Sequence, residues 1–261
     1  MPGALIIDRP ADGVLRLAIS NPTKRNALDH EILAAITDQL STLDDTRCVI
    51  LTGRDGMFSS GYDIGEIDPD SFAEDAEKLV APPFCNALAA LDATDVPTLA
   101  VLTGPTIGGG LELALACDLR LASDQIKLGM PPAKLGLVYS HTGLRRFIDA
   151  IGEPCTRELF LLGRYIDAPT AAVWGLVNWV VDHDELETNA LELATQLAGN
   201  SPLSMAGNKR VLRELLHAEG ALDPDVEREM LALRASSFES QDLLEGVLAF
   251  TQKRTPSWKG R

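Results

Sequence analysis

The sequence predicts a mixed α/β core that is followed by a helical C-terminal region. Up to about Leu128, short runs of strand length alternate with stretches whose apolar residues recur at helical spacing. After about Ser140 the pattern is almost wholly helical. The chain has 261 residues, 46% of them hydrophobic and 23% charged, which is typical of a globular protein with one large core. We place a boundary near residues 200–202, between a core at 1–200 and a helical region at 201–261.

Strands and helices are predicted to alternate in the first half of the chain. Residues 14–19 alternate in polarity and end at Asn21 and Pro22, as a strand does when it enters a turn. Residues 48–52 form an uninterrupted apolar run closed by Gly53, which indicates a strand covered on both faces. The further elements are a helix from about Asp29, helical residues 72–91 on either side of Pro82 and Pro83, a strand at 96–103, a helix at 111–117, and short strands at 119–122 and 126–128.

The second half is predicted to be almost wholly helical. Their apolar residues recur at intervals of three and four, and the stretches are separated by Gly, Pro, Asn or Ser. The predicted helices are residues 143–151, 156–162, 170–174, 185–197, 203–217, 225–237 and 241–253.

Charge and cysteine content exclude several classes of protein. Asp and Glu outnumber Lys and Arg by 38 to 23, so the formal charge is −15 and the pI is near 4.6. A nonspecific grip on nucleic acid or on an anionic membrane is therefore opposed electrostatically. The four cysteines lie far apart without a Cys-x-x-Cys pair, which argues against a zinc site and a disulfide framework. With no export signal or membrane span apparent, we expect a cytoplasmic protein without a metal.

Two glycine-rich turns follow predicted buried strands. Gly108, Gly109 and Gly110 stand immediately before a helix, and residues 57–66 contain a similar turn around Gly61. Glycine leaves backbone N–H groups uncovered, so two such turns can supply two donors to an oxyanion. The phosphate-loop and dinucleotide fingerprints are both absent here. The alternative is that the glycines serve only close packing of strand and helix.

These turns belong to a set of motifs that resembles the crotonase, or enoyl-CoA hydratase/isomerase, family. The motifs are residues 21–28, 58–64, 108–118 and 245–254, in the order and spacing of that family. The resemblance implies a spiral of ββα units, a C-terminal helical region that forms trimers, and an acyl-CoA substrate. It also implies that the backbone N–H groups of Tyr62 and Gly109 hold the thioester oxygen.

The fold does not determine the reaction, because one fold hosts many different reactions. The side chains in the site determine which reaction takes place. Hydratases of the family carry two glutamates; Glu112 matches the first, and Pro132 stands at the place of the second. Proline transfers no proton, so two-carboxylate hydration lacks a partner. Tyr62 and Tyr139 resemble the pattern of the methylmalonyl-CoA decarboxylase branch, although that branch has histidine at the first place. Each residue also has a purely structural alternative. Tyr139 can fill the wall of the pocket, and Glu112 can cap the backbone amides at the start of its helix.

The resemblance favours an acyl-CoA lyase in which decarboxylation of a malonyl-type thioester is slightly ahead of hydration. The alternatives are an enoyl-CoA hydratase that uses Glu112, and a protein that binds acyl-CoA without turnover. CoA is expected as part of the substrate, with no separate cofactor, and the assembly is expected to be a homotrimer or hexamer. The residues matched to nucleotide-binding regions of the family are Lys24, Arg25, Phe250 and Lys253.

Overall fold

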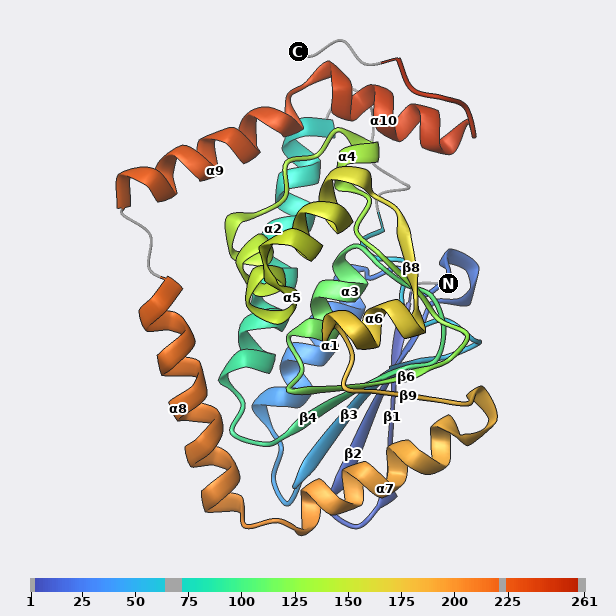
Figure 1. The fold of residues 1–261 in the computed structure, drawn as a ribbon, viewed down its shortest axis with the longest axis vertical. Helices are drawn as coiled ribbons and strands as arrows, with labels where there is room; N and C mark the ends of the chain where they lie inside the picture. Colours follow the sequence, from blue (N-terminus) through green and yellow to red (C-terminus); the bar gives the residue numbers. More distant parts are fainter. Residues whose placement is uncertain (1–2, 64–71, 221–223, 258–261) are drawn as a thin grey trace.

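A six-stranded sheet forms the centre of the protein in the computed structural model, which describes residues 3–63, 72–220 and 224–257 (Figure 1). The strand order is β1-β2-β3-β4-β6-β9; β1 and β2 are antiparallel and every other neighbouring pair is parallel. A smaller sheet has the order β5-β7-β8. The strands are β1 (Ala4–Ala11), β2 (Val14–Ser20), β3 (Cys48–Gly53), β4 (Thr98–Leu102), β5 (Thr106–Ile107), β6 (Leu119–Ser123), β7 (Lys127–Gly129), β8 (Tyr165–Asp167) and β9 (Trp179–Val181).

Helices cover both faces of the large sheet. Every residue of β3 is buried, and because side chains alternate along a strand, Val49 and Leu51 enter one core while Cys48 and Ile50 enter another. The second of these cores is closed by α7. The helices are α1 (His30–Ser41), α2 (Phe72–Ala93), α3 (Gly109–Leu115), α4 (Pro132–Leu135), α5 (His141–Leu162), α6 (Ala168–Trp174), α7 (Leu186–Gly199), α8 (Pro202–Gly220), α9 (Pro224–Phe238) and α10 (Gln241–Thr251), with short 3-10 turns η1 (Pro22–Lys24) and η2 (His183–Glu185).

The structure adds local detail to three expectations from the sequence. The stretch after Ser140 is almost wholly helical, as predicted, but it also contains the three-residue strands β8 and β9, which are too short for a periodic signal. The chain is helical on both sides of Pro82 and Pro83, as predicted, and both sides belong to the single helix α2. The helices predicted at 143–151 and 156–162 lie on either side of a kink in α5 at Gly152, whose φ of 72° departs from helical geometry.

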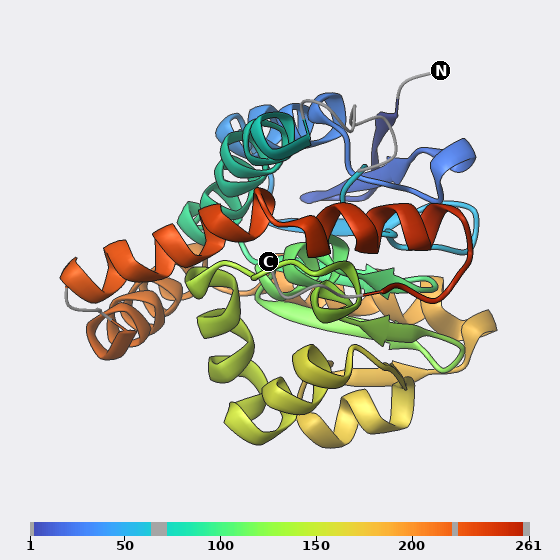
Figure 2. The same cartoon turned by 90° about the horizontal axis from the view of Figure 1, so that it is seen from above.

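Polar side chains anchor the C-terminal helices to the core. The Lys209 ammonium on α8 donates to the carbonyl of Val96 at 2.8 Å and to Asp118 at 2.6 Å. At the other end of this region α10 packs on α4 of the same chain, and a β-carbon at Gly136 would lie only 2.7 Å from the backbone of Asp242. Figure 2 shows α10 in red passing over green segments of the core. The division at residues 200–202 coincides with the turn between α7 and α8, and its status as a domain boundary stays a prediction.

None of the helices in the described part of the chain combines the length and the apolar character that crossing a membrane needs.

Candidate active site

The two glycine-rich turns lie against each other. A parallel bridge joins Ser59 to Thr106, and the N–H of Ile107 donates to the Ser59 carbonyl at 2.9 Å. A β-carbon at Gly61 would stand 2.9 Å from the Ile107 carbonyl oxygen and 3.3 Å from the Gly109 nitrogen. Gly61 also has a φ of +93°, so glycine is required here both by conformation and by the close approach. The contact brings residue 62 beside residue 109.

The backbone direction around Tyr62 follows from its bridge to Leu28. The N–H of Leu28 donates to the Gly61 carbonyl at 2.8 Å, and the N–H of Asp63 donates to the Leu28 carbonyl at 3.2 Å. Peptide groups alternate along an extended chain, so the N–H of Tyr62 points away from Leu28. Gly109 is the first residue of α3 and has no carbonyl one turn earlier in its own helix. This arrangement can present two backbone donors to one ligand oxygen.

Glu112 places a carboxylate one turn into α3. Its side chain is only 3% exposed, and it accepts a hydrogen bond from the hydroxyl of Tyr139. The other carboxylate oxygen lies against Gly143, where a β-carbon would be 2.9 Å away. Gly143 is in the first turn of α5, capped by Ser140, so the positive end of that helix faces the carboxylate. Sequence reasoning identified Glu112 and Tyr139 separately, and the structure joins them.

Aromatic rings form an apolar environment around both tyrosines. The ring of Tyr62 meets Phe84 of α2 edge to face, with centroids 4.8 Å apart. Tyr139 meets Phe160 of α5 in the same way at 5.3 Å. Phe84 and Phe160 are both buried. Polar interactions inside such a low-dielectric environment are stronger than in water.

Pro132 provides no acid or base at the place where the resemblance puts a second glutamate. It is the buried first residue of α4, and its carbonyl accepts from the N–H of Leu137 at 3.0 Å. On α9, the carboxylate of Glu227 lies 3.4 Å from the Nε2 of His141. His141 follows the Tyr139 segment directly, so this contact ties α9 to the site.

The four residues matched to CoA-binding regions lie on two parts of the fold. Lys24 ends η1 and donates to the carboxylate of Asp63 at 2.6 Å, close to Tyr62 in the chain. Arg25 is exposed, and its carbonyl accepts from the N–H of Ser60 at 3.1 Å. Phe250 on α10 is 61% exposed, and Lys253 follows that helix. Their role in holding the nucleotide stays a prediction.

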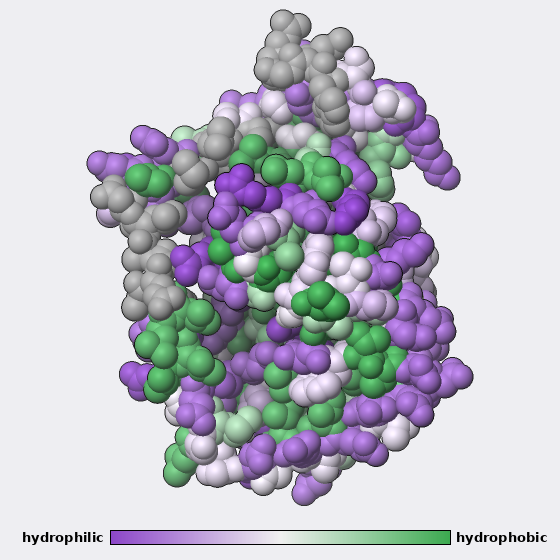
Figure 3. Space-filling model, in the orientation of Figure 1, coloured by the Kyte–Doolittle hydropathy of each residue, from purple (hydrophilic) through white to green (hydrophobic). Residues whose placement is uncertain are grey.

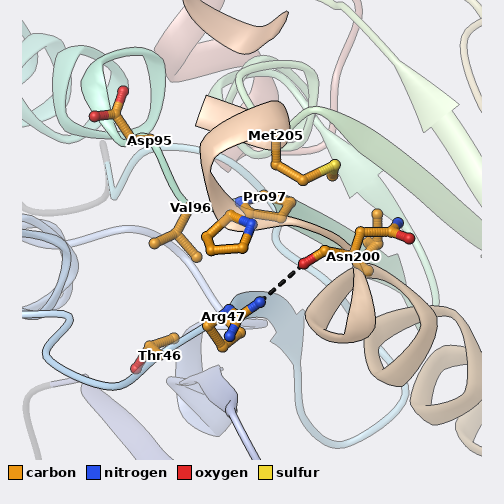
Figure 4. Close-up of a pocket in the computed structure, with 9 residues that line it drawn as sticks. Thr46, Arg47, Asp95, Val96, Pro97, Asn200 and Met205 are labelled. Atoms are coloured by element: carbon orange, nitrogen blue, oxygen red, sulfur yellow. Dashed lines mark hydrogen bonds between the residues drawn. The ribbon is translucent and has the colours of Figure 1, made fainter. Parts of the chain in front are cut away.

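A separate small hollow lies beside the turn between α7 and α8 (Figure 4). Arg47 crosses it and donates to the carbonyl of Asn200 at 2.8 Å. Neither of the glycine-rich turns contributes to it, and Glu112 is not among its lining residues. The hollow is therefore separate from the candidate site at the two turns.

The structure is thus an α/β protein in which a buried carboxylate, that of Glu112, lies on the helix that follows one of the two paired turns. Comparison with known proteins gives the family. The model of the enoyl-CoA hydratase/isomerase family matches residues 9–261. The chain therefore belongs to the enoyl-CoA hydratase/isomerase family, which confirms the resemblance and the fold class.

Individual relatives differ in the reaction that they are named for. The 2,3-dehydroadipyl-CoA hydratase of Escherichia coli K12 is 34% identical, over 98% of this chain and 99% of its own. A solved methylmalonyl-CoA decarboxylase in complex with 2S-carboxypropyl-CoA is 27% identical with a TM-score of 0.90, covering 98% of both chains. An enoyl-CoA hydratase/isomerase from Pseudoalteromonas atlantica T6c is 29% identical with a TM-score of 0.83, covering 98% of this chain and 99% of its own.

Proposed function

We propose that this protein is an acyl-CoA lyase that stabilises a thioester enolate, with decarboxylation of a malonyl-type acyl-CoA favoured over hydration. The N–H groups of Tyr62 and Gly109 hold the thioester oxygen. Each donor of such a hole contributes about 2.7 to 4 kcal/mol, because it is already oriented when the negative charge develops. The contact between Gly61 and Gly109 supports this pairing.

The preference for decarboxylation rests on one observation: the candidate site has one glutamate where hydratases of the family have two. Glu112 is held by the hydroxyl of Tyr139, and Pro132 replaces the second glutamate. Loss of CO2 breaks the bond between the α-carbon and the carboxyl carbon, and the electron pair passes to the enolate oxygen. This step needs no general base. A proton then returns to the α-carbon from the Glu112–Tyr139 pair, from Tyr62, or from a water.

The comparisons lend support to both reactions. The decarboxylase structure has the higher TM-score of the two structures described above, whereas the E. coli relative is a hydratase. Hydration with Glu112 as the single acid–base residue is therefore the second candidate. It requires Glu112 alone to activate water and to return the proton to carbon.

A substrate panel distinguishes the two reactions. Purified protein is incubated separately with methylmalonyl-CoA, ethylmalonyl-CoA and crotonyl-CoA, and CO2 release and water addition are followed. We expect a higher kcat/KM for CO2 release from at least one malonyl-type thioester than for hydration of crotonyl-CoA. Efficient hydration of crotonyl-CoA without CO2 from the other two compounds rejects the decarboxylase proposal and leaves the family assignment intact.

The proposed substrate carries a polyphosphate that an acidic protein has to accommodate locally. We propose that Lys24, Arg25 and Lys253 supply positive charge and that Phe250 packs on the adenine. The hydrogen bond between the Arg25 carbonyl and Ser60 supports a connection from this loop to the glycine-rich turn. No separate cofactor enters the proposed reaction.

We further propose that the exposed face of α8 is covered by other copies of this chain in a trimer or hexamer. Figure 3 shows apolar side chains gathered over α8, and Leu203 is 86% exposed. Light scattering is expected to give a mass of three or six times 28.0 kDa. The double substitution Leu212→Glu and Leu215→Glu buries two charges in that interface and is expected to give the monomer mass. A parent chain that already runs as a monomer contradicts the proposal.

A further inference from the structure

The proposed reaction gives no role to Asn26, a buried residue of the loop between β2 and α1. The side chain is polar although the residue is only 1% exposed, and its φ of 54° lies in the left-handed region, which asparagine adopts more readily than most residues. Burying an amide is costly unless its hydrogen bonds are made. The partners of this amide therefore indicate what the residue is for.

The amide of Asn26 joins its own loop to the start of the first glycine-rich turn. Its Nδ2 donates to the carbonyls of Arg54 and Met57, both at 2.8 Å. Its Oδ1 accepts from the N–H of Asn21, also at 2.8 Å. Both N–H bonds of the amide and its oxygen are thus used. The two donated bonds hold the residues that lead from β3 into the turn, and the accepted bond closes the loop.

The loop held by Asn26 orients the peptide group of Tyr62 directly. The N–H of Leu28 donates to the carbonyl of Gly61 at 2.8 Å, and the N–H of Asp63 donates to the carbonyl of Leu28 at 3.2 Å. The Gly61 carbonyl and the Tyr62 N–H belong to one planar trans peptide group, in which they point in opposite directions. The bond from Leu28 to that carbonyl therefore also sets the direction of the Tyr62 N–H.

A movement of Asn26 is passed on to Leu28 because a single buried residue, Ala27, separates them. The carbonyl of Ala27 is held as well, by the side-chain Nδ2 of Asn21 at 3.1 Å. The short link is therefore fixed at both of its ends and in the middle. Removing the amide of Asn26 frees the link from the turn, and the Leu28 N–H moves with it.

We propose that Asn26 is a positioning residue of the oxyanion hole, which fixes the loop from which Leu28 aims the Tyr62 N–H at the thioester oxygen. The inference rests on the proposed function, because that function makes the Tyr62 N–H an oxyanion donor. Loss of the Asn26 amide displaces this donor and does not delete it. A misplacement of about 1 Å by a change away from the chemistry can cost about 10²-fold in rate.

The inference is tested by the infrared spectrum of bound propionyl-CoA that carries ¹³C at the thioester carbonyl. This compound is the product of methylmalonyl-CoA decarboxylation, so the enzyme does not consume it in the proposed reaction. Hydrogen bonds to the carbonyl oxygen polarise the bond and lower its stretching frequency. In the parent chain we expect a frequency below that in water, and in Asn26→Gly we expect it to return toward the value in water.

Two variants separate the side chain from the backbone conformation. Glycine at position 26 accepts the left-handed φ, so Asn26→Gly removes only the amide. Asn26→Asp keeps the acceptor for the Asn21 N–H but places an oxygen against the two carbonyls. Both variants are expected to lower kcat and kcat/KM together by about 10- to 10²-fold, as expected for an interaction made in the transition state.

The matched control is Thr98→Val, which also removes a buried hydrogen-bonding group. The hydroxyl of Thr98 donates to Asp118 at 2.9 Å, at the end of β4 that lies away from the turns. This variant is expected to lower the melting temperature, as Asn26→Gly does, and to leave the carbonyl frequency and kcat at the parent values. Asn21→Ala is a milder variant of the same loop, since it removes only the bond to the Ala27 carbonyl, and it is expected to move the frequency in the direction of Asn26→Gly by less.

The outcomes distinguish this inference from the proposed function. A folded Asn26→Gly or Asn26→Asp chain that keeps the parent frequency of bound propionyl-CoA overturns the inference, because the amide then has only a structural role. If the parent chain itself binds propionyl-CoA without lowering the carbonyl frequency below that in water, the proposed oxyanion hole is overturned instead. A frequency that is lowered in the parent chain and in Thr98→Val, and restored in the Asn26 variants, supports both.

Discussion

Replacing Gly109 by proline is expected to lower kcat/KM for the acyl-CoA substrate by about 10²- to 10³-fold, which is the cost of losing one oxyanion donor. Proline has no N–H, and its ring occupies the space in which the thioester oxygen is proposed to lie. Gly109 is the first residue of α3, the one helical position at which proline is well tolerated. The helix is therefore expected to remain, and the loss should appear in steady-state kinetics without a collapse of the fold.

Gly109→Ala separates the missing donor from the added bulk. Alanine keeps the N–H, and its β-carbon would lie 3.0 Å from the nearest ring carbon of Tyr62, a contact that a small ring movement relieves. We expect this variant to lose much less activity than Gly109→Pro, with far-ultraviolet circular dichroism confirming that both are folded. Equal activity in the proline variant and the parent chain excludes Gly109 as a donor.

Glu112→Gln is expected to lower kcat by about 10²-fold, because the amide can neither take nor give the proton. Glutamine preserves the size of the side chain and can still accept the hydrogen bond of Tyr139. Binding of the acyl-CoA, measured by calorimetry with an unreactive analogue, is expected to stay close to that of the parent chain. Tyr139→Phe is the companion variant, since it removes the hydroxyl and leaves the ring against Phe160.

This experiment also decides between an enzyme and a binding protein. Turnover that falls while binding persists assigns Glu112 to the reaction. A parent chain that binds acyl-CoA tightly and forms no product from any thioester of the panel supports a binding protein. A Glu112→Gln variant with undiminished turnover contradicts the proposed use of the carboxylate.

Much of the fold could be predicted because single elements carry their own signal. The fully apolar run of β3 required a strand covered on both faces, and the stripe of α1 required an amphipathic helix. β9 carried no such signal, because its pairing with β6 depends on a strand more than fifty residues earlier. α2 passes through Pro82 and Pro83 although proline normally ends or kinks a helix, so the local rule failed there.

In the candidate site, too, some residues carry a local sequence signal, whereas other contacts form only in the folded chain. Gly61, Gly109 and Glu112 could be identified because glycine turns and an isolated acid leave a local pattern that resembles a family. The contact of Gly143 with the Glu112 carboxylate exists only after α5 packs on α3. In the sequence, Gly143 does not differ from any other glycine near the start of a helix until the fold is known.

The proposed position of the thioester oxygen is tested most directly by a crystal structure with an unreactive acyl-CoA analogue bound. We expect this oxygen to lie about 2.7 to 3.1 Å from the backbone nitrogens of both Tyr62 and Gly109, as in oxyanion holes generally. A bound thioester whose oxygen contacts neither nitrogen, or a pair of nitrogens that point into different cavities, contradicts this expectation.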